Sequence, residues 1–151
     1  MRVCIGGTFD ILHKGHKLLI DKAFKIAGKQ GSVFIGITTG EIIKEKRDVK
    51  PFEKRKKTIV QYLSKKKLAD RAIIKPIKDK YGPSLEGEFD VIVVSPETMK
   101  TAEEINRIRG QNGRKPLEII QIPFVLADNG IPISSLRIKK SEIDENGRAL
   151  R

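Results

Sequence analysis

Cysteine, tryptophan and long apolar runs are what this sequence has least of. Cys4 is the single cysteine among 151 residues, which excludes an internal disulfide framework. Tryptophan is absent, and two tyrosines and six phenylalanines are too few to interleave with basic residues as in proteins that stack nucleic-acid bases. No apolar stretch approaches the roughly 20 residues of a membrane-spanning helix, and the N-terminus shows no signal-peptide pattern. We therefore expect a cytoplasmic protein with no membrane partner and with nucleic acid as the less favoured partner.

Basic residues, in contrast, are plentiful and unevenly placed. Lys and Arg number 31 against 19 Asp and Glu, a formal net charge of +12. Residues 1–80 hold 21 basic and 8 acidic side chains, whereas residues 81–151 hold 10 and 11. Such a surface fits anionic metabolites as well as nucleic acid or simple solubility. The length predicts one domain, residues 1–151, large enough to bury a sizeable core.

The most informative stretch is residues 7–16, which holds both histidines of the chain, His13 and His16. It follows a short apolar run, residues 2–5, that predicts a buried strand, and it precedes a helical apolar pattern over residues 17–29. Glycine amides and a helix start attract anions, and histidines three residues apart can face one bound phosphate. A zinc pair is disfavoured because a third ligand would have to be a distant carboxylate. Two ordinary surface histidines are the remaining alternative.

The rest of the chain alternates strand and helix patterns. Further strands are expected near residues 32–38, 72–77, 89–95 and 116–124, with helices near residues 51–66 and 99–109. This alternation predicts an α/β fold: a single-domain, Rossmann-like, open parallel five-stranded sheet with helices on both faces and ligands at the carboxyl edge. The fingerprint Gly-x-Gly-x-x-Gly is missing, so a bound NAD or FAD is disfavoured.

The string Gly7-Thr8-Phe9-Asp10, followed by His13-Lys14-Gly15-His16, resembles the signature of the nucleotidyltransferase superfamily of adenylyl- and cytidylyltransferases. The resemblance implies that His16 contacts the nucleotide phosphates and stabilises the transition state, with His13 beside it. It also implies that Thr8 holds the attacking group of the second substrate. Gly7 and Phe9 then belong to the ATP-binding turn.

A second signature lies near the other end of the chain. Ile133-Ser134-Ser135-Leu136-Arg137-Ile138 resembles the superfamily pattern in which two hydroxyl residues and a basic residue hold the outer phosphates of the nucleotide. The resemblance gives these roles to Ser134, Ser135 and Arg137. Leu136 departs from the usual Thr or Ser, which puts a hydroxyl contact from that position in doubt. By itself, Ser134-Ser135 would predict no more than a helix N-cap.

The superfamily also carries a lysine in the loop after the second strand, ahead of a Pro-x-x-x-Arg helix start, and uses it to clamp phosphates. Lys46 matches this position best, and Lys44 and Lys50 are competing choices. A flexible ammonium suits the role because it can follow a phosphate as the reaction proceeds. The other lysines of this loop are expected to be solvated surface residues.

Three further stretches, residues 93–98, 102–109 and 116–127, resemble the archaeal phosphopantetheine adenylyltransferases and their eukaryotic counterparts. The resemblance implies coenzyme A biosynthesis: ATP and 4′-phosphopantetheine give dephospho-CoA and pyrophosphate, with Mg²⁺ accompanying ATP and no dedicated protein metal site. Direct in-line attack of the acceptor phosphate on the α-phosphorus is expected. Catalysis is assigned to Thr8, His16 and Lys46. Further contacts with ATP are assigned to Glu97 and Thr98. The residues assigned to the acceptor are Thr8, Lys46, Lys50, Asn106 and Arg109.

Several alternatives remain open from the sequence. Glu97 and Thr98 could equally be a first-turn carboxylate and a helix cap. Another acceptor, such as glycerol phosphate, phosphocholine, nicotinamide mononucleotide or flavin mononucleotide, would keep the chemistry. Two further alternatives involve no nucleotidyl transfer: a basic RNA-binding module, and a structural or regulatory domain in which the motifs are vestigial. The oligomeric state stays open.

Overall fold

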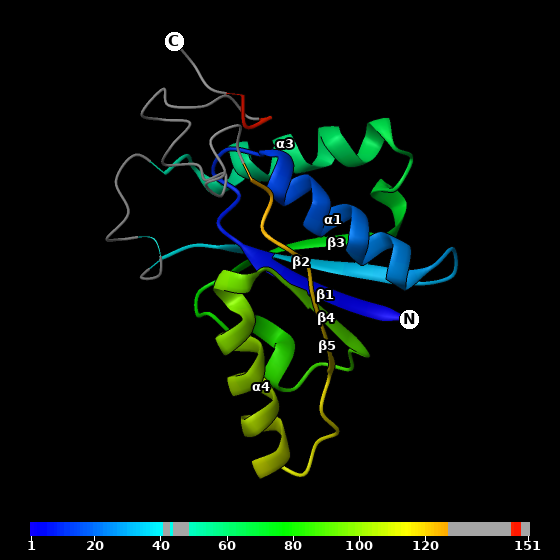
Figure 1. The fold of residues 1–151 in the computed structure, drawn as a ribbon, viewed down its shortest axis with the longest axis vertical. Coiled ribbons are helices and arrows are strands. Elements are labelled where there is room, and N and C mark those ends of the chain that lie inside the picture. Colours follow the sequence, from blue (N-terminus) through cyan, green and yellow to red (C-terminus); the bar gives the residue numbers. More distant parts are fainter. Residues whose placement is uncertain (41–42, 44–48, 127–145, 149–151) are drawn as a thin grey trace.

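The computed structural model describes residues 1–40, 43, 49–126 and 146–148 of the chain. Figure 1 shows the main elements: β1 (Arg2–Gly7), α1 (Lys14–Ala27), β2 (Ser32–Thr38), α3 (Phe52–Lys65), β3 (Ala72–Ile77), β4 (Val91–Val94), α4 (Met99–Gln111) and β5 (Glu118–Gln121). Short 3₁₀ helices, η1 (Ala69–Arg71), η2 (Gly82–Leu85) and η3 (Pro96–Thr98), lie in the connections.

The described strands form one five-stranded parallel sheet in the order β3-β2-β1-β4-β5. The chain builds outward from β1 to β3 on one side and then returns to add β4 and β5 on the other side. The strand order therefore reverses between β1 and β4, and the crevice beyond their carboxyl ends is where ligands bind in such folds. The predicted α/β class, parallel sheet and strand number are confirmed.

Helices cover both faces of this sheet, as predicted. Helices α1 and α3 lie on one face and α4 on the other (Figure 1). The alternation of side chains along β1 explains the division, because Val3 and Ile5 pack in the core under α1 and α3 while Cys4 packs in the core under α4. β4 is buried along its whole length, as expected for a strand inside the sheet.

Several element boundaries differ from expectation. β1 continues through both glycines to Gly7, and β5 spans only Glu118–Gln121. β3, in contrast, has the expected bounds, Ala72–Ile77; it contains Pro76 and lies at the edge of the sheet, where a missing backbone donor is tolerated. The prediction that the entire chain forms one domain stays a prediction, since residues 127–145 lie outside the described residues.

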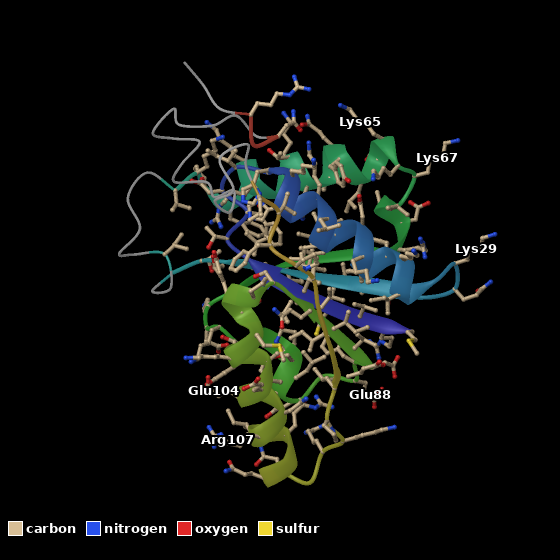
Figure 2. All side chains as sticks on the ribbon, in the orientation of Figure 1. Lys29, Lys65, Lys67, Glu88, Glu104 and Arg107 are labelled. Carbon is tan, nitrogen blue, oxygen red and sulfur yellow. The ribbon has the colours of Figure 1, made fainter. Side chains whose placement is uncertain are left out.

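Basic side chains extend from the side of the fold that carries α1 and α3 (Figure 2). Lys29, Lys65 and Lys67 point outward from the ends of helices and from loops in Figure 2. Within the described part of the chain, no helix combines the length and apolar character needed to cross a membrane.

Candidate active site

A cavity of about 660 Å³ opens at the carboxyl edge of the sheet. One wall comes from the turn between β1 and α1 and from the start of α1, and the opposite wall comes from η2 and α4. It lies at the strand-order reversal, where the topology predicts a ligand site. Its volume is that of an ordinary small-molecule site.

His13 forms the N-cap of α1. Its Nδ1 accepts hydrogen bonds from the backbone N–H groups of Gly15 at 3.0 Å and His16 at 3.4 Å. A Cβ atom on residue 15 would lie 2.9 Å from Cε1 of the His13 ring, so glycine is what lets this ring fold back over the helix start. Because Nδ1 accepts, the neutral ring carries its proton on Nε2.

His16 completes the cap from the third helical position. Its Nδ1 accepts a hydrogen bond from the His13 backbone N–H at 3.4 Å, and its ring stacks on that of His13 with centroids 3.7 Å apart. The Phe9 ring packs against its other side at a centroid distance of 5.0 Å. Both histidines line the cavity, so the predicted pair is brought together at the helix start.

Burial keeps both imidazoles neutral. It lowers the pKa of His13 to about 4. The pKa of His16 falls to about 3, first through burial and then through the neighbouring His13, against the opposing effects of the Ile11 carbonyl and the Asp10 carboxylate. At neutral pH the pair therefore offers neutral N–H donors rather than positive charges.

The turn before the helix is anchored by contacts that the sequence patterns did not predict. The Thr38 hydroxyl donates to Thr8 Oγ1 at 2.9 Å, and Asp10 Oδ1 accepts from the Lys50 backbone N–H at 2.9 Å. Arg55, 1% exposed, donates to the carbonyl oxygens of Thr8, Thr38 and Lys50. Its spacing of four residues from Ile59, which is buried on the same face of α3, was a signal for this burial.

Phe9 combines an unusual backbone with a core side chain. Its φ is 51°, in the left-handed region that a bulky residue rarely adopts, and its side chain is 1% exposed. Burial of the ring holds this conformation and turns the chain sharply between Thr8 and Asp10. Gly7, Thr8 and Phe9 all line the cavity, so the expected ATP-binding turn faces it.

Glu97 and Thr98 also line the cavity, at the end of β4. Thr98 Oγ1 accepts a hydrogen bond from the Ser95 backbone N–H at 3.1 Å and lies 3.3 Å from the Ser95 hydroxyl. Thr98 stands at the N-cap position of α4, but its side chain makes no capping hydrogen bond to that helix. The alternative that Thr98 is a helix cap is therefore correct for its position but wrong for its hydrogen bond, because the hydroxyl contacts Ser95 within the η3 turn.

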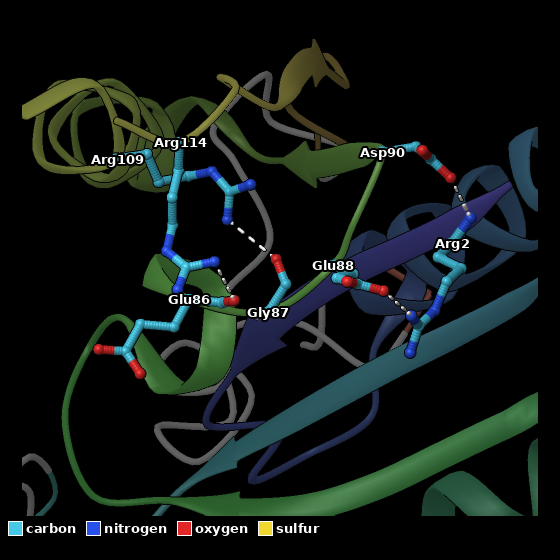
Figure 3. A network of polar contacts seen from close by, with 7 residues as sticks. All are labelled: Arg2, Glu86, Gly87, Glu88, Asp90, Arg109 and Arg114. Atoms are coloured by element: carbon cyan, nitrogen blue, oxygen red, sulfur yellow. Dashed lines mark hydrogen bonds and ion pairs between the residues drawn. The ribbon is translucent and has the colours of Figure 1, made fainter. Parts of the chain in front are cut away.

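Asn106 and Arg109 have structural contacts where acceptor contacts were expected. The Asn106 side chain donates to the Leu117 carbonyl and accepts from the Leu117 N–H, both at 2.8 Å. Arg109, 5% exposed, donates to the carbonyls of Ser84, Gly87 and Lys115, and Figure 3 shows its guanidinium directed at Gly87. Neither of these described residues lines the cavity. Both side chains hold backbone segments together, so we place the acceptor elsewhere.

The loop lysines and the second signature lie largely outside the described residues. Lys44 and Lys46 fall there, as do Ser134, Ser135, Leu136 and Arg137. Lys50 is described and exposed; its backbone, rather than its side chain, makes the contacts with Asp10 and Arg55. The expected phosphate contacts of these residues therefore stay predictions.

The wall opposite the histidines is mainly apolar. Tyr81, Ala102 and Ile105 line it, and the cavity continues to Phe34 and Ile92 on the sheet face under α4. The Tyr81 hydroxyl donates to Glu104 Oε1 at 2.5 Å, and Lys80 pairs with Glu104 Oε2 at 2.9 Å. These contacts tie the segment before η2 to α4 at the edge of the cavity.

The remaining reactive groups are poorly suited to covalent or metal chemistry. Cys4 lines the cavity, but burial raises the pKa of its thiol to about 12. A thiol in that state is a weak nucleophile. In the part of the chain that the structure describes, no three His, Cys, Asp or Glu side chains gather as metal ligands. Asp10 and Glu97 are carboxylates on the cavity wall.

Comparison with known proteins gives consistent results. The model of the family described as Cytidylyltransferase-like matches residues 4–141. The chain is 47% identical over 148 residues, 97% of this chain and 91% of the relative, to a phosphopantetheine adenylyltransferase of Methanosarcina barkeri. It is 40% identical over 148 residues, 97% and 98% of the two chains, to a protein of the same name from Archaeoglobus fulgidus.

Among solved structures, the fold is similar to that of a protein of unknown function from Archaeoglobus fulgidus. The TM-score is 0.73 at 36% identity, over 81% of this chain and 89% of that one.

Proposed function

The chain belongs to the cytidylyltransferase-like family and, within it, to the phosphopantetheine adenylyltransferases, and from this premise we propose how it transfers the adenylyl group of ATP to 4′-phosphopantetheine. The products are dephospho-CoA and pyrophosphate, a step of coenzyme A biosynthesis. The observation that carries the proposal is one cavity lined by the start of α1, a kind of position at which proteins bind phosphates, and by an apolar slot formed by residues such as Tyr81, Ala102 and Ile105.

The triphosphate lies at the start of α1. There the positive end of the helix dipole favours negative charge, the Nε2–H of His13 can donate to a phosphate, and the His16 ring lines the same part of the cavity. His16 stabilises the charge that builds on the α-phosphate and on the leaving oxygen, while His13 holds the outer phosphates. Such preorganised donors in a water-poor site contribute strongly to phosphoryl-type transfers.

The acceptor's phosphate lies at Thr8, where the end of β1 meets the cavity. From there one of its oxygens attacks the α-phosphorus in line, the α–β bridging bond breaks, and pyrophosphate leaves with that electron pair. No covalent enzyme intermediate is involved, and the raised pKa of the buried Cys4 thiol supports this. Orientation and charge stabilisation carry the rate enhancement.

The rest of the acceptor is a largely uncharged arm with two amides, two methyl groups and a thiol. It follows the apolar slot between the sheet and α4, past Tyr81 and Ile105. An acceptor without such an arm, such as glycerol phosphate, would leave this wall exposed to water. The apolar slot therefore favours phosphopantetheine over the smaller acceptors.

We assign further phosphate contacts to four residues outside the described part of the chain. Lys46 clamps the phosphates of both substrates from the loop after β2, and Ser134, Ser135 and Arg137 hold the outgoing pyrophosphate. Glu97 and Thr98, on the cavity wall after β4, complete the nucleotide site. These assignments follow the family resemblance of the motifs.

Mg²⁺ enters with ATP. Magnesium keeps several waters and is commonly held by phosphates plus one or two carboxylates, which fits a cavity whose described wall offers Asp10 and Glu97 singly. When bound, it neutralises phosphate charge. We place the reaction in the cytoplasm, where ATP and phosphorylated intermediates are available.

The direct test is pyrophosphate release from ATP with a panel of acceptors. We expect release with 4′-phosphopantetheine, and at least about a hundredfold lower kcat/KM with glycerol phosphate, phosphocholine, nicotinamide mononucleotide or flavin mononucleotide, because each leaves most slot contacts unmade. An equal kcat/KM with one of these compounds would show that the assignment of phosphopantetheine as the acceptor is wrong. RNA binding that weakens with salt, in a protein that binds no ATP, would favour the nucleic-acid alternative.

A further inference from the structure

Thr38 stands next to Thr8 at the edge of the cavity. In the parallel pairing of β1 and β2, Gly7 lies opposite Ile37, so Thr8, directly after β1, comes beside Thr38, the last residue of β2. The Thr38 hydroxyl donates to Thr8 Oγ1 at 2.9 Å, and both residues line the cavity. Thr38 is 8% exposed, so this hydrogen bond is largely shielded from water.

Arg55 fixes the backbones of the same two residues. Its Nη1 donates to the Thr8 carbonyl at 3.0 Å and to the Thr38 carbonyl at 2.7 Å. One guanidinium nitrogen therefore bridges the ends of β1 and β2. With both backbones held, the separation of the two hydroxyls is set by the fold rather than by a flexible loop.

We propose that Thr38 is a positioning residue for adenylyl transfer, acting through Thr8; this rests on the proposed function. A hydroxyl has a single proton to donate. Because Thr38 uses its proton for Thr8 Oγ1, it can act on a substrate only through Thr8, and the hydrogen bond holds the Thr8 oxygen at the cavity wall. A hydroxyl that accepts a hydrogen bond is also polarised into a better donor. Thr38 thus fixes the position of the Thr8 hydroxyl where the proposed function places the acceptor's phosphate.

The chain offers a closely matched control in the next residue. The Thr39 hydroxyl also donates a hydrogen bond, to the Ile77 carbonyl at 3.1 Å, and Thr39, although described, does not line the cavity. Thr38→Val and Thr39→Val therefore make the same chemical change one residue apart. Thr38→Ser keeps the hydroxyl and loses one methyl group.

The experiment measures kcat and KM for each substrate in these three variants. Thr38→Val should lower kcat/KM for phosphopantetheine about five- to tenfold, the range for one lost neutral hydrogen bond, with KM for ATP unchanged. Thr38→Ser should recover most of that loss. Thr39→Val should lower the melting temperature without changing kcat/KM. Wild-type kinetics in Thr38→Val, or the same loss in Thr39→Val, would overturn the inference.

A double-mutant cycle with Thr8→Val tests whether Thr38 acts through Thr8. If it does, Thr38→Val should cost nothing further once the Thr8 hydroxyl is gone. Fully additive losses would overturn the positioning role and mean that Thr38 touches the substrate itself. A wild-type protein that is inactive with every acceptor would overturn both the proposed function and this inference. If the wild type is active and Thr38→Val has no effect, only the role of Thr38 is overturned.

Discussion

The imidazole rings of His13 and His16 stack almost in parallel, with centroids 3.7 Å apart and an interplanar angle of 18°. Two charged rings could not lie so close in a buried site without strong repulsion. The stacking therefore depends on both rings being neutral, and each Nδ1 is an acceptor within the helix cap. The stacking of the two rings, the proton on Nε2 and the low pKa of each histidine therefore depend on one another.

The first prediction is that the protein loses stability in mild acid. The folded-state pKa values of about 4 for His13 and about 3 for His16 lie below the unfolded value of about 6.5. Between pH 6.5 and pH 4 the unfolded chain therefore binds protons that the folded chain does not. Stability should be complete above pH 6.5 and fall as the pH decreases, by about 1.4 kcal/mol per pH unit for each histidine. Urea unfolding between pH 7 and pH 4.5 measures this slope.

The control for this slope is a His13→Asn/His16→Asn variant, in which asparagine can still cap the helix. It removes both titrating groups and keeps the carboxylates, including Asp10. Its unfolding free energy should change less between pH 6.5 and pH 5 than that of the wild type. An identical slope in the two proteins would contradict the neutral, buried state of the pair.

The second prediction separates catalysis from stability at His16. If His16 stabilises the α-phosphate as proposed, His16→Ala should lower kcat about 10²- to 10³-fold, the effect of losing one such donor. The ring is only partly buried and lines the cavity, so the loss of unfolding free energy should stay near 1 kcal/mol. Steady-state kinetics and thermal unfolding on the same preparation check both. A large fall in melting temperature with little change in kcat would favour a structural role.

The third prediction concerns Arg55, which joins three carbonyl groups beneath the site. Arg55→Lys cannot reach all three, so buried carbonyls lose partners at a cost of about 3 kcal/mol in unfolding free energy. Activity should fall as well, because the Thr8 backbone is no longer fixed. Thermal unfolding and kcat/KM measure the two effects.

Leu63→Ala is the matched control for Arg55, since Leu63 is fully buried on α3 and does not line the cavity. A truncation there costs a similar amount of stability, about 2–5 kcal/mol. At a temperature where both variants are folded, the Leu63 variant should keep its kcat/KM. Equal activities in the two variants would show that Arg55 serves stability alone.

The fourth prediction concerns Asn106. Asn106→Ala leaves the N–H and C=O of the buried Leu117 without their partners, which should cost about 2–3 kcal/mol. The KM for phosphopantetheine should not change, since the side chain faces Leu117 rather than the cavity. Calorimetry and acceptor titrations test this. An unchanged melting temperature with a tenfold higher KM would restore Asn106 as an acceptor contact.

The sequence predicted the sheet and the helix-start site because both depend on local patterns. The apolar runs at Val3 and Val91 identified buried strands, and the glycines and histidines before the helical pattern identified the helix start on the cavity wall, although not the capping contacts of His13 and His16. Each of these signals lies within a few residues of the structure that it predicts.

The contacts that the patterns missed join residues distant in the chain. Arg55 reaches Thr8 across 47 residues, and Thr38 reaches Thr8 across 30. The spacing of Arg55 from Ile59 indicates that the side chain lies on the buried face of α3, but no local pattern identifies the three carbonyl groups that it contacts. Asn106 and Arg109 lie on the predicted helix. Their side chains are directed by contacts with Leu117 and Gly87, and the sequence patterns do not predict where those two residues lie relative to the helix.

The measurement that tests the central claim most directly follows an oxygen label through the reaction. The enzyme is incubated with phosphopantetheine that carries ¹⁸O in its phosphate, unlabelled ATP and Mg²⁺, and the masses of the products are measured by mass spectrometry. The account predicts dephospho-CoA that retains all of the label and pyrophosphate that carries none, because an oxygen of the acceptor's phosphate forms the new bond to the α-phosphorus and pyrophosphate comes from ATP alone. Label in the pyrophosphate, or release of free AMP without dephospho-CoA, would contradict it.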